Sequence, residues 1–342
     1  MLCHTSGLSG SDVLGYKGEN PGVAATLKKD KVHLLREPGT EFVYSEATGF
    51  GVCQLVIEEV TGKNFADYMK SNVFDKLDMK ETSFADESEE LAISYAGMNI
   101  PVQTTHYVMS GASSITTTGE DMAKFALELM RYQQSGAQMF VPQELAGGAW
   151  CLGISAIELS NGKVVFEHNG TLTGWNSQLV IEPSSKNGMI VLTNSDKAFY
   201  MTYQLMEDWG KFVLGSPIVD KNTTNMVYVV KIVLSIFNVL IILILVWNYK
   251  LMKQRKLVKK EKKICVLWRA VTGVVSITAI GCYIVLFYTP VIFKMFYQMS
   301  DYYLYTFFPP IINWLPFGII LLAGIVIWRS GYRKEKRQPR RV

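Results

Sequence analysis

Few side chains in this sequence stand at a spacing that supports chemistry. A serine with a lysine three residues later is one such spacing, because one helical turn brings the amine to the hydroxyl and lets it take the proton. The only such string is Ser160-Asn161-Gly162-Lys163. Its Asn-Gly pair is typical of a hairpin turn, in which the serine and the lysine do not share a helix face. We therefore interpret this string as a coincidence.

The histidines and cysteines do not indicate a metal site or a disulfide framework. His33 and His106 have no partner at metal-ligand spacing, and the H-E-x-x-H pattern is absent. The five cysteines do not have the spacing of a metal finger or of paired disulfides. Taken alone, Tyr44 is interpreted as a tyrosine in a loop and His168 as a histidine at a strand end, without a catalytic role. The residues themselves predict no metal and no cofactor.

The elements that must position these residues follow from periodicity and from capping and turn signals. Helical spacing with capping residues Asn64 and Thr118, and alternating strands around the Asn-Gly turn, define the pattern. The predicted helices are 47–61, 64–73, 118–130 and 197–213, and the predicted strands are 153–159, 163–168, 177–181 and 189–193. Helices followed by an antiparallel meander indicate an α+β fold.

The chain divides by charge and hydropathy into two parts. Of its 342 residues, 49% are hydrophobic and 19% charged, which excludes a disordered chain and a nucleic-acid-binding tail. Residues 1–225 carry 16 basic and 27 acidic residues, whereas residues 226–342 carry 18 basic and 3 acidic ones. The net charges of −11 and +15 sum to the overall +4. We expect a globular domain over 1–222 and a membrane domain over 223–342.

Three apolar runs in the second part are long enough to cross a bilayer, at about 226–247, 266–288 and 311–328. Eight of the residues 250–263 are Lys or Arg, and seven more follow from Arg329 onward. The positive-inside rule places both basic segments in the cytoplasm, and three crossings then place residues 1–225 outside. We expect a multi-pass protein of the cell membrane, whose basic segments either fix this topology or bind anionic lipid.

Four segments resemble the serine β-lactamase and penicillin-binding-protein family, which includes class C β-lactamases, D-Ala-D-Ala carboxypeptidases and esterases. Together they cover about residues 1–215, in the order of the family. The segments are LCHTSGL from Leu2, PGTEFVYSE from Pro38 with its continuation to Thr82, GASSITTTGEDMAKF from Gly111, and EHNGTLTGWNSQLVIEPSSKNGMIVLTN from Glu167. The resemblance implies a β-lactamase/transpeptidase-like domain, with an antiparallel sheet flanked by helices, ahead of the three membrane helices.

The resemblance also implies roles for five residues. Tyr44 stands where the family has the tyrosine of Tyr-x-Asn, a general acid/base, and Glu46 replaces the asparagine. This replacement exchanges an amide donor for an anion, which weighs against a D-Ala-D-Ala-type substrate. His168-Asn169-Gly170 matches H-x-G, so His168 would transfer protons or position the substrate. Gly170 would let the substrate lie against the strand, and the Thr171 N–H would donate to the oxyanion.

The family acylates the serine of an S-x-x-K motif that precedes the H-T-S-G-L turn, and no such motif precedes that turn here. We expect a fragment, incomplete at its N-terminus, whose upstream part holds the nucleophile and an export signal; the alternative is a natural chain without acylating chemistry. The missing strands would leave one sheet edge unpaired.

Two functions follow from the resemblance. The first is a membrane-anchored serine hydrolase of bacterial type, outside the cytoplasm, acting on cell-wall peptide, a β-lactam or an ester. The second is a catalytically silent module that binds penicillin or senses the wall. Both take a small-molecule or peptidoglycan-type ligand and neither takes nucleic acid. A third hypothesis, an outer domain that only binds other proteins, is weaker because it gives no reason for Tyr44 and His168 to stand in family order.

Overall fold

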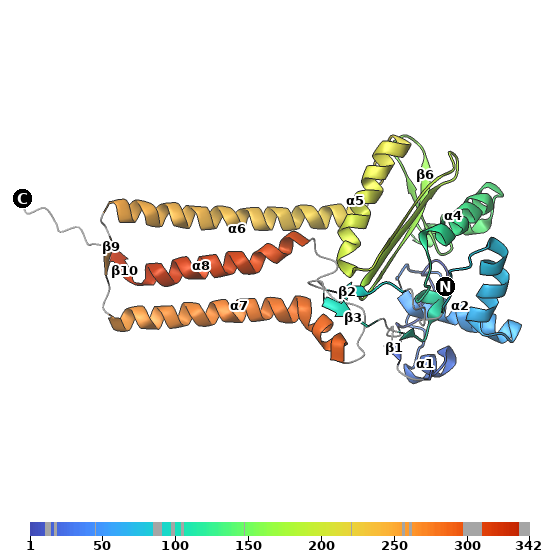
Figure 1. The fold of residues 1–342 in the computed structure, drawn as a ribbon, viewed down its shortest axis with the longest axis horizontal. Helices are drawn as coiled ribbons and strands as arrows, with labels where there is room; N and C mark the ends of the chain where they lie inside the picture. Colours follow the sequence, from blue (N-terminus) through green and yellow to red (C-terminus); the bar gives the residue numbers. More distant parts are fainter. Residues whose placement is uncertain are drawn as a thin grey trace, which may run out of the picture. The chain divides into compact units, whose positions relative to one another are not determined.

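The computed structural model describes the chain except for residues 11–14, 17–18, 45, 85–90, 97–99, 104–105, 147, 220, 255–256, 260–261, 297–309 and 335–342. Two compact units are present, one comprising Met1–Asp220 with Val291–Tyr303 and one comprising Lys221–Pro290 with Leu304–Val342. Each unit has its own architecture, and the two are described separately (Figure 1).

The first unit begins with helices and very short strands. Asn64 caps its helix by accepting a hydrogen bond from the N–H of Ala66, and Thr118 accepts one from the N–H of Asp121, as the capping signals predict. The helices are α1 Val23–Lys29, α2 Glu46–Thr61, α3 Phe65–Met69, which continues as a π-helical turn to Phe74, and α4 Gly119–Gln134. The strands are β1 Gly15–Tyr16, β2 Ser94–Ala96, β3 Ile100–Val102 and β4 His106–Tyr107.

A four-stranded antiparallel meander forms the centre of this unit. Its strands are β5 Ser155–Glu158, β6 Val164–Leu172, β7 Trp175–Glu182 and β8 Asn187–Thr193, in sequential order. Gly162, with φ of 80°, supplies the left-handed backbone in the turn between β5 and β6. The helix α5 Phe199–Trp209 follows the sheet and ends in a π-helical turn to Leu214.

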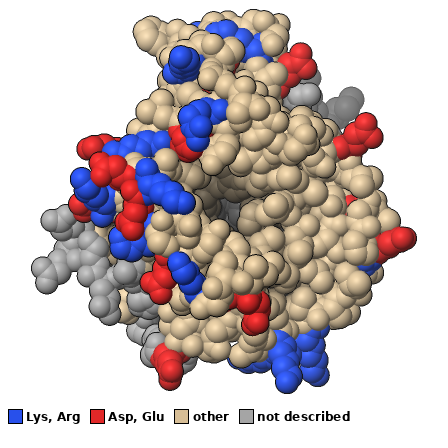
Figure 2. All heavy atoms as spheres, turned by 90° about the vertical axis from the view of Figure 1, so that its right-hand side faces the viewer, with Lys and Arg blue, Asp and Glu red and all other residues tan. Residues whose placement is uncertain are grey.

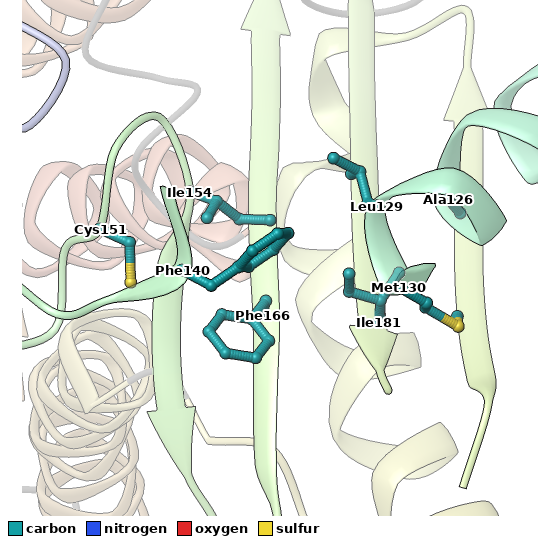
Figure 3. Close-up of a cluster of buried hydrophobic side chains, with 8 residues drawn as sticks. All are labelled: Ala126, Leu129, Met130, Phe140, Cys151, Ile154, Phe166 and Ile181. Atoms are coloured by element: carbon teal, nitrogen blue, oxygen red, sulfur yellow. The ribbon is translucent and has the colours of Figure 1, made fainter. Parts of the chain in front are cut away.

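Helices cover both faces of the sheet. Successive residues of a strand point to opposite faces, so each face carries its own set of side chains that pack against helices. Phe166 and Ile181 pack with Leu129 and Met130 of α4, beside Phe140 on the same face (Figure 3). On the other face, the neighbouring strand residues Val165 and Val180 pack against α5 and the segment after it. This second cluster consists of Leu159, Val165, Val180, Met206, Leu214 and Ile218. The result is a sheet between two helical layers (Figure 1).

The structure confirms the predicted α+β class and corrects the order of its elements. The four short strands β1 to β4 lie among the helices, so strands do not all follow them. Ladders of two or three residues are too short to show an alternating pattern, which explains why the sequence does not reveal them. The strand predicted over 163–168 extends to Leu172, because β7 continues to pair with it.

The second unit consists of three long apolar helices, as predicted. They are α6 Lys221–Lys253, α7 Lys262–Phe296 and α8 Leu315–Ser330, the last preceded by a 3-10 turn from Pro310. Segments 224–253, 265–285 and 311–330 have the length and hydropathy of membrane spans. Two short strands, β9 Leu257–Lys259 and β10 Tyr332–Lys334, pair antiparallel within this unit.

Candidate active site

Tyr44 and His168, 124 positions apart in the sequence, lie against the same indole ring. The centroid of Trp150 is 5.7 Å from the ring of Tyr44 and 5.6 Å from that of His168. His4 completes the group, 4.2 Å from Tyr44 and 5.1 Å from Trp150. We call this set, with two further rings, the aromatic cluster; its members are His4, Phe42, Tyr44, Phe50, Trp150 and His168. The structure thus brings together the two residues that the resemblance places in proton transfer.

The exposure of these rings differs. Tyr44 is 46% exposed and therefore belongs to the accessible surface of the unit. His4 is only 2% exposed. Burial, followed by the nearby positive charges of His168 and the chain's amino terminus, lowers the pKa of His4 to about 4. His4 is therefore a neutral imidazole at pH 7.

From His168 onward, one edge of β6 no longer has a strand paired with it. The strand β5 pairs with residues 164–167 of β6, whereas β7 pairs with residues 166–172. Among the described residues, no strand pairs with the β5-side edge of β6 from His168 to Leu172. An extended ligand can add to such an edge through main-chain hydrogen bonds. The His168 side chain and the open edge are therefore at the same place.

Gly170 and Thr171 lie on this part of β6. A Cβ atom at Gly170 would lie 2.7 Å from the side-chain Oγ of Ser177, so a larger residue here would require that hydroxyl to move. The Thr171 hydroxyl accepts a hydrogen bond of 2.8 Å from the amide of Asn176, which fixes this side chain on the sheet. The oxyanion role expected of Thr171 uses its main-chain N–H and does not depend on this side chain.

The remaining expected residues are placed as follows. Glu46 begins α2, but its side chain lies outside the described residues, as does Ser45. Ser160 lies in the turn between β5 and β6 and its hydroxyl is 2.8 Å from that of Ser216. Ser160 and Lys163 do not lie on a helix, in agreement with the hairpin that the Asn-Gly pair between them predicts. Among the described residues, no group of three His, Cys, Asp or Glu side chains gathers as a metal site.

A polar group behind His168 orders the strand from the other face of the sheet. Glu167 accepts hydrogen bonds from the Ser155 hydroxyl and, at 2.8 Å, from the Gln178 amide. The Asn169 amide bonds to the hydroxyl of Tyr203 on α5. These contacts flank His168 on both sides and hold the backbone that presents it.

The sequence does not predict that Trp150 and His4 belong to the aromatic cluster. Trp150 lies outside the four family-like segments, and nothing near it in the sequence marks it as a contact of Tyr44 and His168. His4 belongs to a segment interpreted only as a structural turn. Its φ of 57° is uncommon for a residue other than glycine. The turn signal around Gly7 indicates an unusual backbone, but not that the imidazole enters the cluster.

The helix-flanked antiparallel sheet and the order of its segments define a domain of the β-lactamase and transpeptidase class. The chain belongs to the Beta-lactamase family, which matches residues 1–207. Residues 1–207 of the first unit are therefore a domain of that family, and the long apolar helices lie beyond the matched part.

Individual relatives are distant. The unguisins hydrolase ungD of Aspergillus violaceofuscus (strain CBS 115571) is 23% identical over 274 residues, covering 65% of this chain and 47% of that protein. A penicillin binding protein from Bacillus halodurans is 23% identical, with a TM-score of 0.49 over 57% of this chain and 66% of its own. A D-stereospecific amidohydrolase from Streptomyces sp. is 20% identical, with a TM-score of 0.46 and the same coverage. The chain spans about half the length of the curated relative.

Proposed function

We propose that the first unit supplies the proton-transfer groups and the substrate-binding strand of a serine hydrolase acting on amide or ester bonds. The observation that carries this proposal is that Tyr44 and His168 contact one indole ring, 5.7 and 5.6 Å away, beside the open edge of β6. Two groups able to exchange protons at one place fit the general acid–base step of acyl transfer.

The acylated serine is the part of the mechanism that these residues do not supply. Among the described residues, Ser160 is the only serine with a lysine three positions on, and its turn does not give the two a common helix face. We propose that the parent protein carries an S-x-x-K helix outside this sequence, as the family pattern requires. Without it, the same geometry supports a second function, a module that binds the substrate class without acylation.

The three apolar helices complete the proposal. They are proposed to anchor the hydrolase in a membrane, with the first unit outside the cytoplasm and the basic segment 250–263 inside it. The charge asymmetry supports this orientation, because eight Lys and Arg residues lie between the first two apolar runs. Cell-wall peptide, a β-lactam or a simple ester are the ligand classes proposed for the open strand edge.

Covalent labelling with a fluorescent penicillin and a fluorophosphonate tests the catalytic part. We expect no label on residues 1–342, and label on a parent chain that includes S-x-x-K. In that parent, Tyr44→Phe and His168→Ala should each slow labelling on the order of 10²-fold, because each removes a proton-transfer group. Tyr132→Phe and His33→Ala, which change exposed residues outside the cluster, are the matched controls.

Two results would contradict the proposal. Label on residues 1–342 that disappears with Ser160→Ala would make the hairpin serine the nucleophile. Equal rates in the cluster variants and in their controls would remove Tyr44 and His168 from the mechanism, leaving the binding function.

A further inference from the structure

A polar cavity of about 460 Å³ lies beside α2, apart from the residues of the aromatic cluster. Most of its lining is uncharged and able to form hydrogen bonds, and Glu58 is the one formal charge among the described residues that line it. The polar lining includes Tyr16, Gln54, Asn64, Tyr107, Ser110 and Ser114. A cavity with a single carboxylate and many neutral hydrogen-bonding groups suits a polar ligand that carries one positive charge.

The Glu58 carboxylate is held at one oxygen only. Its Oε1 accepts hydrogen bonds of 3.2 Å from the Gln54 amide and of 3.2 Å from the N–H of Phe65. Within the described part of the chain, Oε2 accepts no hydrogen bond and no Lys, Arg or His lies at ion-pair distance. One oxygen therefore fixes the carboxylate, and the other is available to a donor in the cavity.

Gln54 makes this arrangement rigid. It is 5% exposed, its amide donates to Glu58, and its Oε1 accepts a 3.0 Å hydrogen bond from the N–H of Gly111. Both ends of the Gln54 amide are therefore used within the protein. The residue ties the turn around Gly111 to the carboxylate, and so orients Glu58 before any ligand arrives.

Two features of the cavity wall are unfavourable when each is taken alone. Glu58 lies in the last turn of α2, where the helix dipole disfavours a negative charge by about 0.3–1 kcal/mol, and that turn has no basic residue; the hydrogen bond from the N–H of Phe65, the first residue of α3, offsets this cost. Ser114 has a φ of 77°, a left-handed conformation that costs a residue with a side chain on the order of 1–2 kcal/mol. Unfavourable features of this kind concentrate at sites that bind ligands.

The cavity and the aromatic cluster share one face of α2. Phe50 lies 5.7 Å from the His4 ring, and Gln54 and Glu58 follow it at intervals of four residues. Eight residues of helix rise about 12 Å. An extended peptide covers this distance with three to four residues.

We propose that this cavity binds the ammonium group of a peptide ligand through Glu58, and that the rest of the peptide runs along α2 toward Tyr44 and His168. The ammonium pairs with the available carboxylate oxygen, and the neutral polar residues bind the first amide groups. The direction of the peptide rests on the proposed function. The ammonium site itself does not.

Isothermal titration calorimetry of the complete chain in detergent micelles tests the site. The probes are tetra-alanine amide, which has a free ammonium group, and its N-acetylated form, which lacks the charge. We expect the free amine to bind at least about 10-fold more tightly, and Glu58→Gln to reduce this preference to less than about 2-fold. Glu59→Gln is the matched control, because Glu59 is the exposed neighbour of Glu58 in the same turn.

Equal binding of both probes, or of neither, would overturn the site, as would an equal loss of preference in the two glutamine variants. The glutamine keeps an oxygen that can accept from the N–H of Phe65, so the unfolding midpoint of Glu58→Gln should stay close to that of Glu59→Gln, and a lost preference would then not reflect lost folding. Binding needs no acylation. If the ammonium preference is present but Tyr44→Phe leaves acyl transfer in the parent unchanged, the proposed function fails and the site stands.

Discussion

At the scale of the residue, His4 couples the aromatic cluster to pH. Its pKa, lowered to about 4 by burial and by the nearby positive charges, lies below the value near 6.5 of an unfolded chain. Between these values the unfolded chain binds a proton that the folded chain does not. The contribution of His4 to the free energy of unfolding should therefore be complete above about pH 6.5. Below that, the free energy of unfolding should fall by on the order of 3 kcal/mol as the pH approaches 4.

Urea unfolding across this pH range measures the effect. His33→Gln, which changes an exposed histidine, should keep the loss of stability, whereas His4→Gln should remove most of it. Proton NMR of the histidine rings gives an independent reading, since the His4 signal should shift with a midpoint near pH 4. A midpoint near 6.5 would show that the imidazole is not buried in solution.

The sequence predicts some of the cluster and misses the rest for physical reasons. Tyr44 and His168 are found because each belongs to a short segment with family-like order. Trp150 is missed because an indole is a common core side chain, and only the fold brings it between the other two rings. The open edge of β6 is missed as well, since it depends on where β5 ends.

At the scale of the element, the start of α4 is fastened by one buried carboxylate. Asp121 is 2% exposed and accepts hydrogen bonds from the N–H of Glu81, the hydroxyl of Thr82 and the ammonium of Lys124, at 2.8, 2.9 and 3.1 Å. Burial alone would raise the pKa of Asp121, but these hydrogen bonds outweigh it and lower the pKa. The start of α4 and residues 81–82 are thus joined through an ionised group.

Asp121→Asn should lower the free energy of unfolding by about 2 kcal/mol at pH 7, because a charge-assisted acceptor is lost in a buried place. Glu120→Gln, its exposed neighbour, should change it by less than about 0.5 kcal/mol. The contribution of Asp121 is complete above its unfolded pKa, about 3.9, and disappears as the pH falls through the lower folded value. Urea unfolding at pH 7 and below 4 checks both statements; a gap that persists in acid would assign the effect to packing.

The elements follow the sequence where local signals are strong. Thr118 and Asn64 cap the helices that their spacing predicts, and the Asn-Gly turn joins two antiparallel strands. The π-helical ends of α3 and α5 have no such signal in the sequence. The strand β8 pairs with β7 alone among the described strands, and its residue Leu192 is 41% exposed.

At the scale of the whole molecule, the charge pattern makes a prediction about sidedness. In a background without the five native cysteines, Glu59→Cys should react with an impermeant maleimide on intact cells, and Lys253→Cys should react only after the membrane is opened. Both positions are exposed to solvent in the structure. Reaction of Lys253→Cys on intact cells would reverse the proposed orientation.

The small ladder between β9 and β10 restricts this topology in a way that charge does not. Val258 is paired with Arg333, and Tyr332 with Lys259, so the segments on either side of α7 and α8 form one hydrogen-bonded structure. Two strands can pair only within one aqueous compartment. In the proposed membrane arrangement the chain between them would therefore cross the bilayer an even number of times, and we infer that α7 and α8 would insert together as a pair. The helix α6 alone would then determine whether the first unit and the ladder lie in opposite compartments.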